Sequence, residues 1–269
     1  MRILAITNQK GGVGKTTTCV NLAASLAATK RRVLLIDLDP QGNATTGSGV
    51  DKSAMKQTVY HVLIGKKTLK EVMQPSIKGK FDVIPANRDL AGAEVELVNE
   101  IARETRLKVA LAELGDNYDY VLIDCPPALN LITVNALTAA HAVMIPMQCE
   151  YYALEGLAYF MEAMSKIRDA VNESLHIEGI VMTMYDPRVS LGGQVRAEIE
   201  THFKDQLFAT TIPRNVRLAE APSFGKTILQ YDPRSKGSEA YVLLAKELLV
   251  RKGAKDLGPA AQPRALAAV

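Results

Sequence analysis

Cysteine is scarce in this sequence, and long apolar runs are absent. The 269 residues include three cysteines, Cys19, Cys125 and Cys149, which lie far apart and form no CxxC pair. So few thiols argue against a disulfide framework, a zinc site or a cysteine-ligated cluster, and they are typical of the reducing cytoplasm. No stretch approaches the ~18 apolar residues that a membrane span needs, and the apolar start is too short for a signal peptide. We therefore expect a cytoplasmic protein.

The chain also lacks a large net charge and a large content of aromatic residues. Lysine and arginine number 32 against 29 for aspartate and glutamate, so the net charge of +3 neither requires nor excludes a polyanionic partner. Aromatic residues make up 5% of the chain, which argues against a surface that stacks nucleic-acid bases. What the chain does have is 48% apolar residues, enough for one large α/β domain with a full core.

Short apolar runs alternate with longer stretches of helical period, which predicts a parallel sheet covered by helices. The expected strands are 3–7, 33–37, 120–124, 142–146, 180–184 and 208–212. The expected helices include 16–28, 90–113, 156–170 and 238–251. We expect a single domain over residues 1–252, followed by an Ala/Pro-rich tail, 253–269, whose composition predicts disorder.

The strongest motif is the run Gln-Lys-Gly-Gly-Val-Gly-Lys-Thr-Thr at residues 9–17, directly after the first strand and opening the first helix. A triphosphate needs several hydrogen-bond donors without side chains in the way. Glycines let backbone N–H groups turn inward, and a helix N-terminus adds the positive end of its dipole. Lys15 would reach the β- and γ-phosphates, and the hydroxyl of Thr16 would ligate Mg²⁺.

The pattern GxxxxGK[ST] fails at one position, because Gln9 stands where the first glycine belongs. The alternative is a glycine-rich turn without a ligand, against which the GKT triplet and the strand–loop–helix context both argue. The predicted nucleotide-binding residues of this loop are Lys10, Gly11, Gly12, Val13, Gly14, Lys15, Thr16 and Thr17.

Lys10 is placed unusually, because it lies on the wrong side of the glycines to serve the same phosphate as Lys15. One possibility is that it reaches a nucleotide in a second subunit, as an arginine finger does. The other is a solvated loop lysine, and the local sequence does not decide between the two.

Three aspartates follow predicted strands. Asp124 ends an apolar run before Cys-Pro-Pro, where a carboxylate can hold Mg²⁺ directly or through water. Asp37 and Asp39 end another strand, and an acidic group beside a γ-phosphate can orient the attacking water. The alternative for each is an aspartate that caps the following turn.

Residues 10–17 resemble the deviant Walker A motif of the ParA/MinD family of P-loop ATPases. The resemblance continues through residues 35–43, 121–127 and 212–217, and so covers nearly the whole chain to about Val250. It is strongest toward the chromosomal ParA (Soj) branch of DNA-segregation ATPases. It implies an α/β P-loop NTPase fold with a mostly parallel twisted sheet and helices on both faces. ATP and Mg²⁺ would be the cofactors, and hydrolysis would be slow.

The same resemblance assigns roles to individual residues. Lys10 would act across a nucleotide-sandwich dimer, Asp39 would orient the attacking water beside Lys15, and Asp37 would support the magnesium site of Thr16 and Asp124. The segments 37–43 and 124–131 would act as switches that sense the γ-phosphate. Pro213, Arg214 and Asn215 would lie beside the adenine, with an ordinary strand-to-helix turn as the alternative.

Three outputs stay open. In the first, an ATP-bound homodimer binds double-stranded DNA on the nucleoid without sequence preference, and a ParB-type partner stimulates hydrolysis. Phosphate contacts of this kind need basic residues on one face. The candidates are Arg188, Arg217, Lys226, Arg234 and Lys236. A solvated surface of mixed charge is the alternative for this set.

The second output is a MinD-like membrane-associated ATPase, which needs a C-terminal amphipathic helix with bulky apolar residues. The tail has few such residues and contains Pro259 and Pro263, so we expect no membrane partner. The third is a metal-cluster or metabolic P-loop enzyme, for which no paired cysteines are present. Because the glycine-rich loop begins by residue 9, we also expect no N-terminal helix-turn-helix domain.

Overall fold

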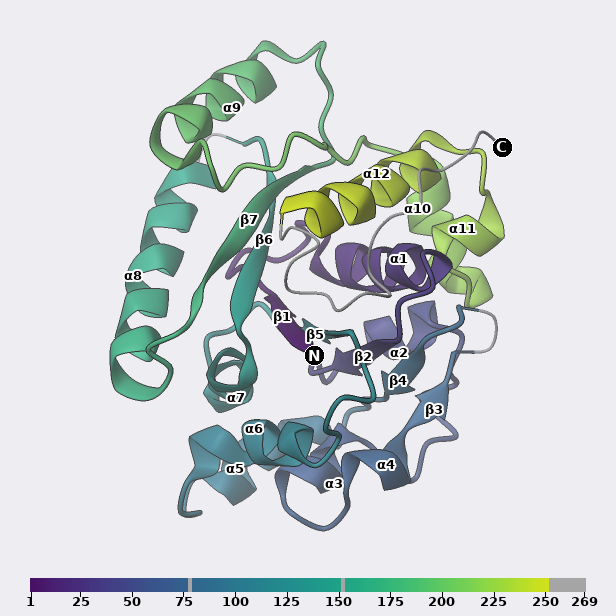
Figure 1. Ribbon diagram of the computed structural model, residues 1–269, viewed down its shortest axis with the longest axis vertical. Coiled ribbons are helices and arrows are strands. Elements are labelled where there is room, and N and C mark those ends of the chain that lie inside the picture. The colour runs from purple at the N-terminus through teal and green to yellow at the C-terminus, as the bar shows by residue number, and fades with distance from the viewer. Residues whose placement is uncertain (77–78, 151–152, 252–269) are drawn as a thin grey trace.

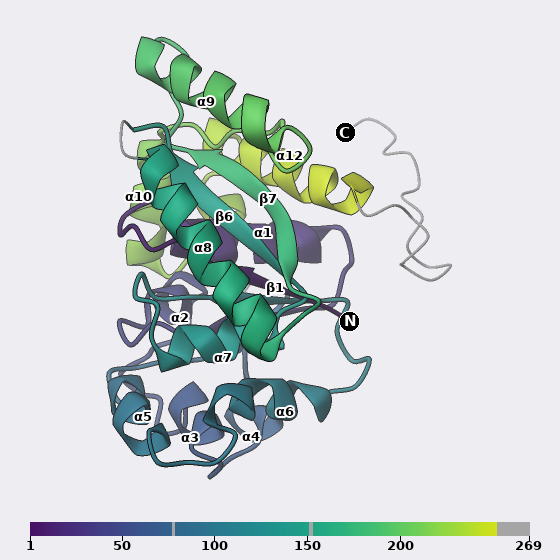
Figure 2. The ribbon, with the colours of Figure 1, turned by 90° about the vertical axis from the view of Figure 1, so that its left-hand side faces the viewer.

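A computed structural model describes residues 1–76, 79–150 and 153–251, and the predicted tail 253–269 lies outside these ranges. One sheet runs through the middle of the molecule with helices on both of its faces (Figures 1 and 2). Neighbouring strands are parallel, except that β3 is antiparallel to β4. In sheet order the strands are β3 (Gln74–Pro75), β4 (Asp82–Ile84), β2 (Val33–Asp37), β5 (Tyr120–Asp124), β1 (Arg2–Ile6), β6 (Ala142–Gln148) and β7 (His176–Thr183). The predicted fold class is confirmed.

Side chains alternate between the two faces of each strand, so the strands other than β3 contribute to two cores. On one face the buried residues of the strands pack with α1 (Lys15–Ala28) and α12 (Lys236–Arg251). The other core includes residues of α3 (Val59–Leu63), α5 (Leu90–Leu97), α6 (Arg106–Ala112), α7 (Leu131–Ala139) and α8 (Ala153–Val171). The remaining helices are α2 (Asn43–Gly47), α4 (Leu69–Val72), η1 (Arg103–Thr105), α9 (Ser190–Phe203), α10 (Val216–Glu220), η2 (Ala221–Phe224) and α11 (Ile228–Tyr231).

The prediction of a strand at 208–212 is wrong. This segment runs beside β7 but makes only isolated bridges, Ile180 with Leu207 and Tyr185 with Pro213. Between those bridges the ladder is interrupted, because the N–H groups of Ala209 and Thr210 donate to the carboxylate of Glu247 on α12, each at 2.8 Å. The other five predicted strands are all present, and the short strands β3 and β4 were not expected.

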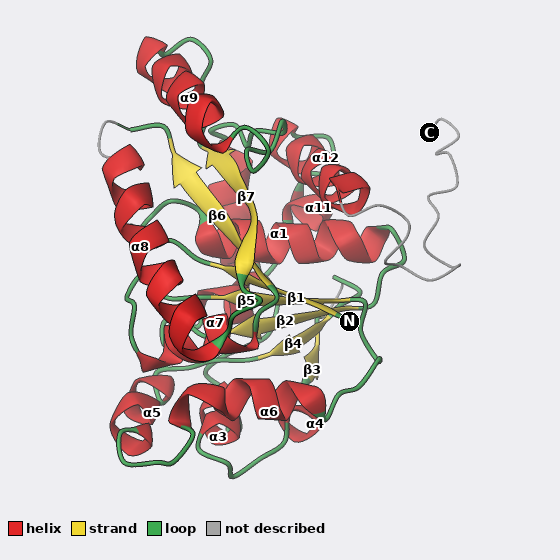
Figure 3. Cartoon of the chain, turned by 60° about the vertical axis from the view of Figure 1, so that its left-hand side comes forward, coloured by secondary structure: helices red, strands yellow, loops and turns green. Residues whose placement is uncertain are grey.

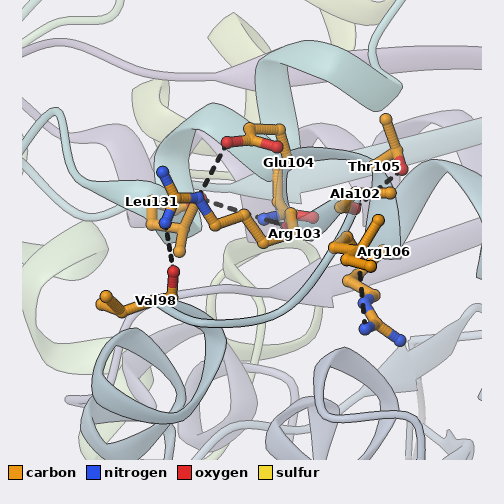
Figure 4. A network of polar contacts seen from close by, with 9 residues as sticks. Val98, Ala102, Arg103, Glu104, Thr105, Arg106 and Leu131 are labelled. Atoms are coloured by element: carbon orange, nitrogen blue, oxygen red, sulfur yellow. Dashed lines mark hydrogen bonds and ion pairs between the residues drawn. The ribbon is translucent and has the colours of Figure 1, made fainter.

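The predicted helix 90–113 is also wrong as a single helix, because it is divided into α5, η1 and α6. α5 ends at Leu97, and Ala102, just before η1, adopts a left-handed conformation with φ of 55° that a continuous helix does not allow. Beside it, the guanidinium of Arg103 pairs with Glu104 and donates to the carbonyl oxygen of Val98 (Figure 4). The chain therefore turns here and restarts as α6.

Asn135, buried on α7, stabilises this turn from the neighbouring helix. Its amide donates to the carbonyl oxygens of Arg103 (2.8 Å) and Leu131 (3.0 Å), and its Oδ1 accepts from the N–H of Leu107 (3.2 Å). One side chain thus connects η1, α6 and α7, and it supplies a partner for the N–H of Leu107, which lies in the first turn of α6 and has none within that helix.

Replacing Asn135 with alanine should lower the free energy of unfolding by about 2–3 kcal/mol, because buried backbone groups lose their partners. Urea denaturation followed by circular dichroism measures this. The exposed Asn117, which donates to the carbonyl oxygen of Leu114, provides the matched control. If Asn135→Ala costs no more than Asn117→Ala, the anchoring role is wrong.

Candidate nucleotide-binding site

The parallel register brings the predicted site residues to one edge of the sheet. Ile6 at the end of β1 pairs with Asp124 at the end of β5, and Asp37 at the end of β2 pairs with the same residue. The glycine-rich loop follows β1 directly. The carboxyl ends of parallel strands are where α/β sheets bind ligands.

The loop is held at both ends by side chains of its surroundings. The amide of Asn8 donates to the carbonyl oxygen of Pro146 (2.9 Å), and its Oδ1 accepts from the N–H of Lys10 (3.0 Å). Farther along, the hydroxyl of Thr183 on β7 donates to the carbonyl oxygen of Val13 (2.7 Å). The loop is therefore fixed independently of any ligand.

Two of the glycines are required by the backbone itself. Gly12 and Gly14 have φ of 76° and 85°, in the left-handed region that a side chain disfavours. Gly14 precedes α1 and offers no side-chain cap, so the first N–H groups of α1 are free to meet an anion. This geometry suits a phosphate group.

Lys15, the first residue of α1, is 7% exposed. Its ammonium group donates to the carbonyl oxygen of Lys10 (2.9 Å), so the side chain lies back over the loop. Burial lowers its pKa, against the opposing effect of Asp124. Phosphate oxygens at this position would favour the charged form of Lys15.

Asp124 and Thr16 form the part of the site that fits a divalent cation. Thr16 Oγ1 donates to Asp124 Oδ2 at 2.7 Å. The other oxygen, Oδ1, is buried and has no hydrogen-bond partner within the described part of the chain. Burial, and next the charge of Asp37, raise the pKa of Asp124 well above its usual range. A hard cation with oxygen ligands would satisfy this carboxylate, so the residues present fit Mg²⁺.

Asp37 is fully buried, and both of its carboxylate oxygens accept hydrogen bonds from residues that follow it in the chain. Its Oδ1 accepts from the N–H of Asp39 (3.1 Å), and its Oδ2 accepts from both the N–H and the hydroxyl of Thr45 (2.7 Å each). Burial raises the pKa of Asp37 to about 6. Asp37 therefore ties the end of β2 to α2, and its support of the metal stays a prediction.

Asp39 lies at the same edge and is partly exposed. Its Oδ1 accepts from the N–H of Gln41 (2.9 Å), which closes the turn after β2. Its negative charge acts to raise the pKa of both Lys15 and Asp124, so it stands near both. The arrangement agrees with a carboxylate beside the phosphate site, and its role with water stays a prediction.

Lys10 lies on the outside of the loop and forms an ion pair with Glu150, which follows β6. The two side chains are 42% and 53% exposed. An ion pair so exposed is weak and exchanges readily for another partner. The placement leaves both alternatives for Lys10 open, while it separates this lysine clearly from the buried Lys15.

Pro213, Arg214 and Asn215 lie beside the C-terminal end of β7. Asn215 accepts from the N–H of Arg217 (2.9 Å) and so caps α10. The exposed Arg214 lines a cavity of about 180 Å³ that also reaches Gln148, Met184 and Tyr185. Gln148 Nε2 in turn donates to the carbonyl oxygen of Gly12 (3.3 Å), so this cavity adjoins the loop.

Three residues of this region were missed from the sequence: Gln148, Thr183 and Met184. Met184 has φ of 49°, an uncommon conformation for a side chain of its kind and one that concentrates at functional sites. No pattern in the sequence around Met184 predicts this backbone conformation. Gln148 and Thr183 are polar residues at strand ends, which is too common a feature to single them out.

The predicted DNA-contacting residues are all exposed. Four of them, Arg217, Lys226, Arg234 and Lys236, lie along residues 216–236, which we call the basic segment (yellow-green in Figure 1). Arg188 lies on the loop after β7, which the Tyr185–Pro213 bridge brings beside the start of this segment. Arg188 pairs with Asp186 (2.6 Å), and Arg217 pairs with Glu220 (2.9 Å). Such exposed pairs are weak enough to yield to phosphate.

None of the helices in the described ranges has both the length and the apolar character that a membrane crossing requires.

Replacing Lys15 with alanine should lower the affinity for ATP–Mg²⁺ at least about a hundredfold, because charge-assisted hydrogen bonds to phosphate contribute about 1.5–3 kcal/mol each. Isothermal titration calorimetry measures the change. Lys166→Ala, which removes an exposed lysine paired with Glu162 on α8, is the control and should bind as the unaltered protein does. Equal affinities in the two variants would reject the phosphate-binding loop.

Comparison with known proteins agrees with this geometry. A family described as an AAA domain matches residues 1–177. The chain is 54% identical over 247 residues to the sporulation initiation inhibitor protein Soj of Bacillus subtilis. This match covers 92% of this chain and 98% of the relative. It is 51% identical over 251 residues to the chromosome-partitioning ATPase Soj of Thermus thermophilus, covering 93% and 96%.

Among solved structures, the chain is similar to the cobyrinic acid a,c-diamide synthase of Mycobacterium smegmatis with bound ADP and magnesium. The TM-score is 0.82 at 38% identity, over 93% of this chain and 94% of that one. The sequence relatives are more similar in sequence and extend over the same length. The chain therefore belongs to the ParA/MinD family of P-loop ATPases, in the group of the Soj/ParA chromosome-partitioning proteins.

Proposed function

We propose that this partition ATPase forms a homodimer when ATP and Mg²⁺ are bound, and that the dimer binds double-stranded DNA without sequence preference. A ParB-type partner would stimulate hydrolysis, which returns the protein to monomers that release the DNA. The protein would act in the cytoplasm, on the nucleoid, in the segregation of a chromosome or plasmid. The observation that carries the proposal is the placement of the two loop lysines, Lys15 buried over the loop and Lys10 on its outer surface.

The chemistry in one protomer follows from the buried residues. Lys15 would exchange the carbonyl oxygen of Lys10 for phosphate oxygens, and the amides at the start of α1 would hold the same anion. Thr16 and Asp124 would hold Mg²⁺, which when bound neutralises charge on the phosphates. Asp39, partly exposed at the same edge, would orient the attacking water.

The outer face of the loop supports a second copy as the partner of Lys10. A Cβ atom on Gly11 would meet nothing within 4 Å among the described residues, and the backbone there is not left-handed. The fold of the protomer therefore does not itself require glycine at this position. Close approach of another chain would require it, and would bring Lys10 toward the nucleotide of that chain.

The basic segment supports the DNA-binding part of the proposal. It carries Arg217, Lys226, Arg234 and Lys236 against two acidic residues, Glu220 and Asp232. A dimer would present two such segments, and phosphate contacts are additive and independent of base sequence. The names of the Soj relatives connect the family to chromosome partitioning, which this mechanism would serve.

Binding assays with ADP–Mg²⁺, with ATP–Mg²⁺ and without nucleotide should show DNA binding only with ATP. We expect affinity for unrelated duplex sequences to agree within about threefold and to weaken steeply with salt, as phosphate contacts require. Fluorescence anisotropy measures this, with anionic liposomes tested in parallel. Lipid binding in place of DNA binding would favour a MinD-like role, and binding to neither would favour a metabolic enzyme like the synthase.

Gly11→Val should leave ATP affinity within about threefold of the unaltered protein while it prevents the ATP-dependent dimer, because the side chain occupies the space of the second chain. Sedimentation with a slowly hydrolysed ATP analogue measures dimer formation. Gly193→Val on α9, another glycine whose Cβ would meet nothing within 4 Å, is the control and should dimerise normally. A dimer of normal stability in Gly11→Val would count against the sandwich.

A further inference from the structure

The basic segment lies against two helices that begin at the nucleotide site. α1 starts with Lys15 and Thr16, and it lies next to α11 and α12 (Figure 3). α2 starts shortly after Asp37 and Asp39, and it contacts η2 within the basic segment. Both supports of the segment therefore originate at residues that would contact phosphate or magnesium.

One buried side chain of α1, Asn21, makes a hydrogen bond to the basic segment. Its Oδ1 accepts from the N–H of Ile228, the first residue of α11, at 2.7 Å. Its amide donates to the carbonyl oxygen of Thr17 on α1 at 2.8 Å, which fixes the orientation of the side chain. Asn21 is 5% exposed, and its hydrogen bond with Ile228 is shielded from water. The start of α11 is thus capped by a residue of the phosphate-binding helix.

The contact with α2 includes a close approach of two stretches of backbone. Gly225 ends η2 with φ of 59°, and a Cβ there would lie 3.3 Å from Cα of Gly49 and 3.7 Å from the carbonyl oxygen of Thr46. Thr46 belongs to α2, whose neighbouring residue Thr45 is bound by the carboxylate of Asp37. A side chain at position 225 would therefore crowd the backbone at the end of α2.

The basic segment is also connected internally. The hydroxyl of Tyr231 donates to Glu220 Oε2 (3.1 Å), the residue that pairs with Arg217. The rings of Phe224 and Tyr231 stack with their centroids 5.1 Å apart. Lys226 stands two residues before Ile228, so the position of α11 determines where both Lys226 and Arg217 are presented.

We propose that Asn21 is a positioning residue that couples the nucleotide site to the basic segment through its hydrogen bond with Ile228. The inference rests on the proposed function, because it describes how that segment is regulated. Two sites influence each other only when both bias the arrangement of a shared element. Here α1 is shared, since it would contact phosphate at its start and it accepts the N–H of Ile228 of α11 in its second turn.

Hydrogen–deuterium exchange of peptides within 216–236 tests the coupling without DNA. The protein should show different exchange with ADP–Mg²⁺ and with a slowly hydrolysed ATP analogue. Asn21→Ala should reduce that difference at least about fivefold, the lower end of usual coupling. Ile228→Pro removes the N–H that donates this hydrogen bond. Proline is tolerated at the first position of a helix, which Ile228 occupies in α11. This variant tests the coupling if Asn21→Ala does not fold.

Tyr241→Phe is the matched control, because the hydroxyls of Tyr241 and Thr18 form a buried hydrogen bond (3.2 Å) between α12 and α1 that does not involve α11. It should keep the nucleotide-dependent difference. The affinity for DNA with ATP, divided by the affinity for DNA with ADP, should be about tenfold lower in Asn21→Ala than in the unaltered protein. The affinity for ATP itself and the formation of the dimer should be unchanged. Tyr241→Phe should keep the ratio.

The outcomes separate the two proposals. If the unaltered protein binds no DNA in any nucleotide state, the proposed function fails, while the exchange difference and its loss in Asn21→Ala still establish the coupling. If the exchange difference is absent in the unaltered protein, or persists in full in both Asn21→Ala and Ile228→Pro, the coupling is overturned even where DNA binding depends on ATP.

Discussion

The hydroxyl of Thr16 donates a hydrogen bond to one oxygen of Asp124, and the other oxygen of that buried carboxylate has no partner within the described residues. A carboxylate removed from water in this way costs the fold free energy when it is charged. Its raised pKa expresses the same cost, since the free energy of unfolding then falls as the pH rises above the ordinary value for aspartate. This cost falls at the position where a bound cation and triphosphate would offset it.

The rest of the site is arranged around this carboxylate. The parallel register places Asp37 and the end of β1 on either side of Asp124. Lys15 then provides the positive charge, and its own pKa is lowered by the same burial. Lys10, by contrast, stands in solvent with an exposed acidic partner. Two lysines of one loop thus have different electrostatic environments, one buried and one in solvent.

Local signals predicted the loop and the strand-end aspartates, because glycine spacing and apolar runs that end in aspartate are contained within a few residues. Distant residues decided where prediction failed. Glu247 takes two N–H groups that would have continued a strand at 208–212, and Asn135 stabilises the break between α5 and α6. Met184 was missed because its left-handed backbone depends on how β7 ends beside the loop. Such contacts join segments far apart in the chain, and no local pattern encodes them.

The most direct measurement compares ATP binding with Mg²⁺ and with EDTA, by calorimetry, in the unaltered protein and in Asp124→Asn, which keeps the shape of the side chain. The account predicts that Mg²⁺ strengthens ATP binding by the unaltered protein, and that Asp124→Asn loses about 10- to 100-fold of that gain, as expected for a metal-holding residue. Affinity in EDTA should be similar in the two proteins. An equal gain from Mg²⁺ in both would contradict the assignment of Asp124 and Thr16 as the metal site.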